Sequence, residues 1–292
     1  MRVTDHLQHL VIAFALPLAA SAQTTIDALS CHAYAGNLGW INARPGTAQG
    51  LSLTEFTLDG WTYAANVGWI HFGDGSPADG VRYRNNSATD CGVNHDGAGN
   101  LSGYAYGANI GWINFDWAAA SHPQRPRVNL INGMFDGFAY SANTGWIQLG
   151  GGLLKTTRIV TADQDADGIS DAWEKQHFGN TTTASAHSDA DHDGQPDVQE
   201  YLAATNPGSA LEHFQVLSQS TQASGTQMTL SFRSSSARLY RIEHTSTLTG
   251  PWTDSALGLF APDAGGVTTR TITFPPSTAR FFRVVTVRPL NP

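Results

Sequence analysis

One motif occurs four times in the first half of this 292-residue chain and constrains the fold more than any other feature. The copies share the pattern [A/T]-Y-x-[A/G]-N-x-G-W-I and align without gaps. They are residues 32–43 (HAYAGNLGWINA), 61–72 (WTYAANVGWIHF), 104–115 (YAYGANIGWINF) and 138–149 (FAYSANTGWIQL). Such a repeat indicates one structural unit used several times, whose apolar face is covered by neighbouring copies.

Each copy has the pattern of a β-hairpin. Short segments of alternating polarity lie on either side of x-Asn-x-Gly, and Asn and Gly both tolerate the positive φ angles of tight turns. A lone hairpin is marginal in water, so the four units must pack on one another. The pattern leaves three arrangements open, which are a small propeller, a solenoid and a sandwich.

The rows of Trp and Tyr allow two interpretations. Copies of one unit share their core residues first, which makes the repeating Trp the core. Flat aromatic faces also stack on pyranose rings, so the alternative is a carbohydrate-binding surface. The less regular aromatics Trp61, Tyr83 and Trp117 are expected to be more exposed and form the candidate ligand platform. Residues 31–150 resemble the Asn-x-Gly-Trp-Ile repeats of bacterial exported and surface proteins, a resemblance that implies no particular chemistry.

Two acidic loops follow, at residues 163–174 and 189–200, and both match the calcium-loop pattern D-x-[DN]-x-[DN]-G-x5-E. Ca²⁺ takes about six to eight oxygens. Loop positions 1, 3 and 5 supply carboxylates, position 7 a main-chain oxygen and position 12 a bidentate Glu, and position 9 often acts through water. The predicted ligands of two Ca²⁺ ions are Asp163, Asp165, Asp167, Ile169, Asp171 and Glu174, and Asp189, Asp191, Asp193, Gln195, Asp197 and Glu200.

Neither loop has the entering helix of an EF-hand, because the residues before them are β-branched or rich in Ser and Thr. Short helices are expected after each loop, at 171–178 and 197–204. Residues 163–207 resemble the calcium repeats of dockerins and thrombospondin type 3 modules. That resemblance implies structural calcium that stiffens an inter-domain segment. The alternative is a pair of solvated acidic loops without metal.

The last part of the chain alternates again, as in Met228-x-Leu230-x-Phe232, and turn residues separate six or seven short strands. This spacing predicts a β-sandwich. The segments LYRIEHTSTLTGPW and ARFFRVV resemble the immunoglobulin-like or fibronectin type III-like modules of secreted bacterial proteins. The resemblance implies an architecture and says nothing of a ligand.

The N-terminal apolar segment LVIAFALPLAA, residues 10–20, is too short to span a membrane. With the small residues Ala20 and Ala22 it predicts a signal peptide cleaved after Ala22, the alternative being a buried strand or helix. Export to an oxidising compartment favours a disulfide between Cys31 and Cys91, the two cysteines of the chain. Two buried free thiols are the alternative.

The charges exclude some partners. The chain has 16 Lys and Arg against 24 Asp and Glu, and most of the excess negative charge lies in the two acidic loops. So few cations argue against nucleic acid as a partner. The motifs H-E-x-x-H and G-x-S-x-G do not occur in the sequence, nor does a phosphate-binding Gly-rich loop. We therefore expect no enzyme.

The sequence thus predicts a mainly β protein in four parts. These are a signal peptide (1–22), a repeat β domain of hairpin units (23–158), a tandem calcium-loop segment (159–208), here called the acidic-loop segment, and an immunoglobulin- or fibronectin III-like sandwich (209–292). The expected function is that of a secreted or cell-surface, calcium-binding structural or adhesive protein. Its partner would be an extracellular polysaccharide or a surface protein, and the mature chain would have no transmembrane span. The alternatives are a carbohydrate-binding module that uses exposed aromatics and a glycan-active enzyme.

Overall fold

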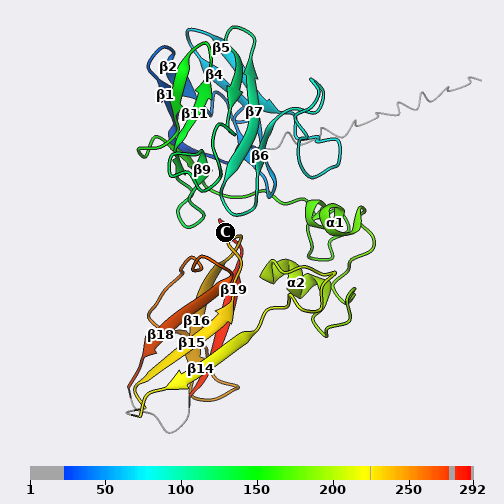
Figure 1. The fold of residues 1–292 in the computed structure, drawn as a ribbon, viewed down its shortest axis with the longest axis vertical. Coiled ribbons are helices and arrows are strands. Elements are labelled where there is room, and N and C mark those ends of the chain that lie inside the picture. Colours follow the sequence, from blue (N-terminus) through cyan, green and yellow to red (C-terminus); the bar gives the residue numbers. More distant parts are fainter. Residues whose placement is uncertain (1–22, 224, 276–279, 291–292) are drawn as a thin grey trace, which may run out of the picture.

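The computed structural model describes residues 23–223, 225–275 and 280–290, and it confirms the mainly β class (Figure 1). A repeat domain, the acidic-loop segment with two helices, and a sandwich follow one another along the chain. The predicted signal peptide lies outside the described residues. Neither helix in the described ranges is long and apolar enough to cross a membrane.

The four repeats form four hairpins that stand side by side in a closed ring. The hairpins are β1 (Ile26–Ala35) with β2 (Gly39–Asn42), β4 (Thr57–Ala64) with β5 (Gly68–Gly73), β7 (Leu101–Gly107) with β8 (Gly111–Asn114), and β11 (Phe138–Ser141) with β12 (Gly145–Gln148). Neighbouring hairpins pair antiparallel, and β12 pairs back with β1 through Tyr34↔Gln148 and Ala35↔Ile147. The domain is therefore a closed eight-stranded barrel, rather than the small propeller, the solenoid or the sandwich that the repeats left open.

Shorter strands extend the hairpins at the end opposite the turns. For example, β3 and β6 pair with β4 at its start, and β13 pairs with β1 at Ile26 and Cys31. The short strands of this domain are β3 (Ser52–Leu53), β6 (Val93–His95), β9 (Arg127–Val128), β10 (Phe135–Asp136) and β13 (Leu154–Thr156).

The two faces of each hairpin carry different residues of the motif. Side chains alternate between the faces of a strand, so the Ile after each Trp faces inward when the Trp faces outward. The inward set is at most 5% exposed and consists of Ala33, Thr62, Ala105, Ala139, Ile41, Ile70, Ile113 and Ile147. The repeating Trp are 43–56% exposed: Trp40, Trp69, Trp112 and Trp146. The prediction that they form the core is therefore wrong, because small residues and Ile fill the interior.

The predicted disulfide is also wrong, because both cysteines are free thiols. Cys31 lies on β1, where its Sγ is 3.7 Å from the main-chain oxygen of Ala28. Cys91 lies just before β6, and its Sγ is 3.2 Å from Asn85 Oδ1. Each thiol has its own local partner, so the structure favours the alternative of free thiols, of which Cys31 is buried and Cys91 half-buried.

The C-terminal domain is a sandwich of two three-stranded sheets. One sheet has the order β14 (Val216–Thr221), β15 (Gln227–Arg233) and β18 (Val267–Thr273), and the other β17 (Thr253–Asp254), β16 (Leu239–Thr245) and β19 (Phe281–Val287). Phe232 from the first sheet and Tyr240 from the second pack together, with ring centroids 5.2 Å apart. Both sheets thus contribute to one core.

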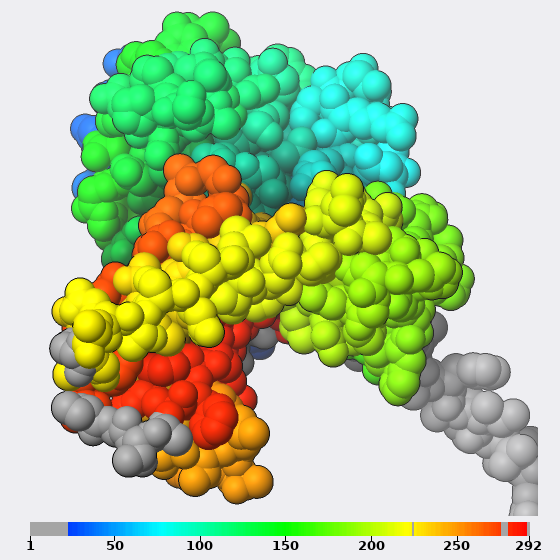
Figure 2. Space-filling view, turned by 60° about the horizontal axis from the view of Figure 1, so that its bottom comes forward, coloured from blue at the N-terminus to red at the C-terminus, as the bar shows by residue number. Residues whose placement is uncertain are grey.

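The end of the chain returns to the barrel. Leu290 packs against the barrel core, and its main-chain oxygen accepts a hydrogen bond of 3.3 Å from the Ile159 N–H. Figure 2 shows the acidic-loop segment, in yellow-green, against both of these domains. The barrel and the sandwich are therefore joined at two places, directly and through this segment.

Candidate metal centres

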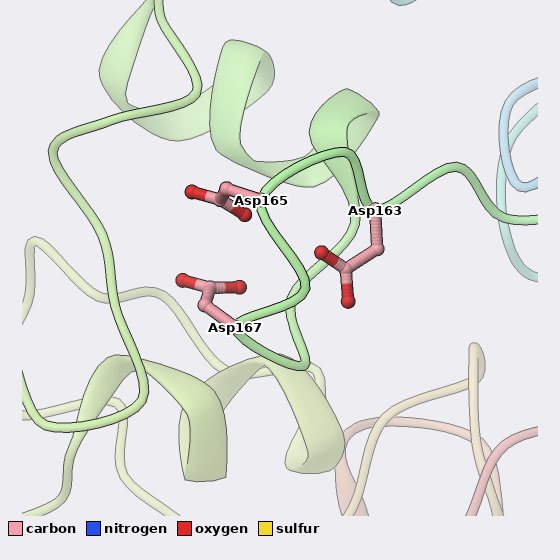
Figure 3. Close-up of side chains that lie close together, drawn as sticks. All are labelled: Asp163, Asp165 and Asp167. Atoms are coloured by element: carbon pink, nitrogen blue, oxygen red, sulfur yellow. The ribbon is translucent and has the colours of Figure 1, made fainter.

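The first acidic loop, residues 163–174, folds so that three carboxylates converge (Figure 3). Asp163, Asp165 and Asp167 each place an oxygen within 4.8 Å of the other two. Gly168 has a φ of +95°, and its N–H donates to Asp163 Oδ2 at 3.1 Å. The Ile169 N–H donates to Asp167 Oδ1 at 2.8 Å. Gly at the sixth position thus turns the chain back toward the first carboxylate, as the motif requires.

The second acidic loop, residues 189–200, repeats this geometry. Asp189, Asp191 and Asp193 converge within the same 4.8 Å. Gly194 has a φ of +96° and donates to Asp189 Oδ2 at 3.0 Å, and the Gln195 N–H donates to Asp193 Oδ1 at 2.7 Å. The two loops share little beyond Gly and the acidic positions, so those positions determine the local fold.

The ninth residue of each loop begins a helix. Helix α1 (Asp171–Phe178) and helix α2 (Asp197–Ala203) match the expected exiting helices. Asp171 Oδ1 accepts from the Gln164 N–H at 2.9 Å, and Asp197 Oδ1 accepts from the Ala190 N–H at 3.1 Å. These carboxylates hold the second residue of their own loop, which is consistent with a water-linked contribution at position 9.

The twelfth residues, Glu174 and Glu200, lie outside the 4.8 Å groups and are completely buried beside them. Burial and then the neighbouring Asp charges raise the pKa of each glutamate to about 7. Within the described residues, neither carboxylate oxygen of Glu174 has a hydrogen-bond donor, nor has Glu200 Oε2. Buried acceptors without a donor are unfavourable, and a divalent cation would satisfy them. The residues of both loops therefore fit a hard cation.

The seventh residues offer only their main-chain oxygens to a metal, because their side chains are used elsewhere. The Ile169 side chain is buried in a small core with Trp173, Ala184 and Tyr201. Gln195 Nε2 donates to the main-chain oxygen of Phe214 at 2.9 Å. The rings of Trp173 on α1 and Tyr201 on α2 lie 5.5 Å apart, so one apolar core holds the two loops together.

The first loop contacts the barrel. The Ser170 hydroxyl, next to Ile169, donates a short hydrogen bond to Glu55 Oε2, and it also accepts from the Trp173 N–H at the start of α1. Burial raises the pKa of the Glu55 carboxyl, which the Ser170 hydrogen bond and nearby arginines partly offset. Gln176 on α1 accepts a second contact, of 3.1 Å, from Arg82 Nη1.

The second loop contacts the sandwich. Tyr201 follows Glu200 directly, is fully buried, and accepts a hydrogen bond of 2.7 Å on its hydroxyl from Arg288 Nη1. Arg238 donates to the main-chain oxygens of Tyr201 and of Leu202, the latter at 2.9 Å. The guanidinium groups of Arg238 and Arg288 also lie 5.7 Å and 5.5 Å from the centre of the Tyr201 ring.

Sequence reasoning missed this junction. It surrounds a cavity of about 280 Å³ lined by residues of all three parts, among them Glu55, Trp173, Arg238 and Arg288. Glu55 stands 115 positions before Ser170, and no local pattern marks it as a partner of the loop. The arginines are single cations in strand-like sequence. The one available signal is Tyr201, an aromatic residue directly after a predicted ligand.

The candidate ligand platform is only partly exposed. Trp61 is 43% exposed and its ring lies 4.3 Å from that of His71. Trp117 is half-buried, and its indole N–H donates to the main-chain oxygen of Phe138 at 2.6 Å. Tyr83 is buried, with its hydroxyl 2.8 Å from Asp59 Oδ1, so its assignment to a surface platform is wrong.

The repeated Trp and Tyr are all exposed, each by at least 38%. Each Trp faces the Tyr directly opposite it on the hairpin, with ring centroids 4.8–5.2 Å apart. These four pairs are Tyr34–Trp40, Tyr63–Trp69, Tyr106–Trp112 and Tyr140–Trp146. They form a belt of aromatic surface around the outside of the barrel near the turns.

Comparisons of this chain with protein-family models, with curated proteins and with solved structures gave no match. The resemblances to dockerin and thrombospondin type 3 repeats, to bacterial surface repeats and to fibronectin III-like modules therefore rest on the sequence motifs alone.

Proposed function

We propose that this chain is a secreted or cell-surface structural protein, without enzymatic activity, in which two Ca²⁺ ions fix the barrel relative to the sandwich. The observation that carries the proposal is the burial of Glu174 and Glu200 beside three converging Asp each, with carboxylate oxygens that lack donors in the described residues. Export is supported by the apolar segment at residues 10–20 and the small residues that follow it.

The donor set favours calcium over other divalent ions. All side-chain donors at the two sites are carboxylate oxygens, which suit hard cations rather than zinc or copper. Mg²⁺ demands a tighter octahedral shell and gives up its waters reluctantly, whereas Ca²⁺ accepts a flexible cage with a bidentate Glu. When bound, calcium would supply the positive charge that offsets the converging carboxylates.

The two loops lie between the barrel and the sandwich, so loosening of the loops would also loosen the contact between these domains. Ser170 is the eighth residue of the first loop and contacts Glu55 of the barrel. Tyr201 directly follows the last residue of the second loop and contacts Arg238 and Arg288 of the sandwich. Mutual repulsion of uncompensated carboxylates would loosen both loops and both contacts. Carboxylates neutralised by bound calcium would therefore stabilise the arrangement of the barrel relative to the sandwich.

The direct test is metal analysis of the purified protein combined with unfolding in the presence and absence of a chelator. We expect about two Ca²⁺ per chain and a clear fall of the melting temperature on chelation. A chain that holds no metal after dialysis against about 1 mM Ca²⁺, and whose melting temperature ignores the chelator, contradicts the proposal.

A second candidate function is carbohydrate binding, and the exposed Tyr–Trp belt favours it. Tyr and Trp present large apolar faces together with a polar group, which suits the mixed surface of a sugar ring. The adhesive partner would then be an extracellular polysaccharide. A polysaccharide array probed with the wild type and with Trp-to-Ala variants of the belt tests this function, and binding unchanged in all variants contradicts it.

A further inference from the structure

The third hairpin differs from the others because a neighbouring segment forms a hollow beside its aromatic rings. This open hollow has a volume of about 430 Å³, within the usual range for small-molecule sites. Tyr104 on β7 and Trp112 on β8 line it from the barrel wall, and their ring centroids lie 6.2 Å apart. The other lining residues come from the segment before β6 and are Asn85, Asn86, Ser87 and Cys91.

This segment is held rigidly next to the rings. Asn85 has a φ of +56°, an uncommon conformation for a residue other than Gly. Its Oδ1 accepts from the Gly92 N–H at 3.0 Å, and its own N–H donates to the main-chain oxygen of Asp90 at 2.9 Å. The turn so fixed leaves Asn86 and Ser87 exposed at the rim of the hollow. The wall is therefore formed in advance of any ligand, which reduces the entropic penalty of binding.

The lining chemistry points to a neutral, hydroxyl-rich ligand. Two aromatic rings provide the apolar wall, and the Asn86 amide and the Ser87 hydroxyl provide donors and acceptors at its rim. The Asn85 amide is already bonded to Gly92 and Tyr83 and holds the turn. No side chain that lines the hollow carries a charge. In the described part of the chain, the Asn86 amide makes no hydrogen bond to protein, so it is free to bind a ligand.

We propose that this hollow binds a pyranose unit of a neutral polysaccharide, with the sugar ring against Trp112 and hydroxyl groups on Asn86. The inference rests on the carbohydrate-binding function, the second candidate above, and assigns it to one hairpin. The fourth repeat supports this choice. There Trp117 packs against Trp146, the residue equivalent to Trp112, with ring centroids 4.8 Å apart, and takes up space beside that ring.

The first hairpin provides a matched control. Trp40 occupies the same motif position as Trp112, is similarly exposed, and faces Tyr34 just as Trp112 faces Tyr106. It is not among the residues that line the hollow. Trp112→Ala and Trp40→Ala therefore remove the same side chain from equivalent strands. Only Trp112 has the segment with Asn85 and Asn86 beside it.

The experiment titrates the full chain, in calcium-containing buffer, with cellohexaose, mannohexaose and maltohexaose, followed by calorimetry and Trp fluorescence. We expect one of these neutral oligosaccharides to bind. Trp112→Ala and Asn86→Ala should each weaken that binding at least about tenfold, equivalent to about 1.4 kcal/mol. Trp40→Ala changes the belt but not the hollow, so it should weaken binding much less than either of these variants. Asn86→Ala keeps the test valid if Trp112→Ala fails to fold, since Asn86 is exposed and makes no hydrogen bond within the described residues.

Each other outcome overturns the assignment in a distinct way. Equal losses in Trp112→Ala and Trp40→Ala would place binding on the shared Tyr–Trp pairs, leaving the carbohydrate function but not this site. No binding of any of the three oligosaccharides by the wild type would overturn both. Neither result would affect the proposed calcium scaffold, which is tested by chelation.

Discussion

The side-chain amide of Asn37 donates a hydrogen bond of 3.1 Å to the main-chain oxygen of Thr144, 107 residues further along the chain. This contact joins the first hairpin turn to the last. The other three repeats make the same contact with the preceding turn, at 2.9–3.1 Å: Asn66 to Leu38, Asn109 to Val67 and Asn143 to Ile110. A ring of four equivalent hydrogen bonds thus closes the turn end of the barrel and explains why each copy contains Asn.

The ring of hydrogen bonds predicts that the side-chain N–H group of each repeated Asn contributes to stability. In Asn143→Asp the side chain keeps its shape but presents oxygen to the Ile110 carbonyl. We expect a loss of about 0.5–1.5 kcal/mol in the free energy of unfolding, measured with urea in calcium buffer. Asn86→Asp is the control, because that exposed amide has no protein partner in the described residues. An Asn143→Asp variant as stable as this control would show that the ring contributes nothing.

The same repeats show how far the sequence leads. Repetition of Trp40 and Ile41 in every copy indicates equivalent positions, and strand alternation puts the two on opposite faces. Which face points inward depends on the width of the closed barrel, whose interior accepts Ala and Ile but not four Trp. Closure itself depends on the pairing of Tyr34 with Gln148, a long-range contact with no local signal.

The acidic loops, unlike the repeats, can be predicted from local sequence. Their geometry follows from positions within a dozen residues, so the convergence of Asp163, Asp165 and Asp167 and the exiting helix are predictable from the motif alone. The contacts that place the loops between the domains, such as that of Ser170 with Glu55, join segments distant in sequence. These contacts cannot be predicted from the motif. Sequence therefore predicts the candidate metal centres and not what they hold together.

Glu174→Gln should change stability in opposite directions with and without calcium. In chelator, the variant removes a buried charge beside three Asp, so it should be more stable than the wild type. In calcium it loses a bidentate ligand. Saturation at about 100 times Kd should stabilise the wild type by about 2.7 kcal/mol per site, and the variant should lose most of this for the first site. Melting curves in both buffers measure the two effects.

Asp254→Asn is the control for this inversion, because it removes an exposed carboxylate on β17 of the sandwich. Its stability should shift little in either buffer. If Glu174→Gln destabilises equally in chelator and in calcium, the glutamate has a structural role unrelated to metal.

Because the His95 ring is buried, we expect the folded protein to lose stability in mild acid. In this ring Nδ1 is 3.0 Å from the Glu55 main-chain oxygen, while Nε2 accepts from the Gly99 N–H at 3.1 Å. Burial lowers the pKa of His95 in the folded state below its usual value of 6.5. The unfolded chain therefore binds the proton first, and the stabilisation present above pH 6.5 is lost as the pH falls toward the folded-state pKa.

Urea unfolding between pH 7.5 and pH 5, in excess calcium so that the acidic loops stay ionised, measures this effect. His71 and His177 have pKa values shifted in the same direction, so the comparison is between the wild type and His95→Gln. The variant should show the smaller dependence on pH. Identical slopes would mean that His95 does not titrate in this range.

Glu55 should control how firmly the acidic-loop segment stays on the barrel. Glu55→Ala leaves the Ser170 hydroxyl without its acceptor, whereas Glu55→Gln keeps an oxygen at that place. In saturating calcium we expect thermolysin to cleave the connection at residues 157–163 about tenfold faster in Glu55→Ala, equivalent to about 1.4 kcal/mol of local opening, and less so in Glu55→Gln. Glu212→Ala is the matched control, because this exposed carboxylate lines the same junction cavity. Cleavage of Glu55→Ala at the rate of Glu212→Ala would mean that the segment is held to the barrel by other contacts, such as that between Arg82 and Gln176.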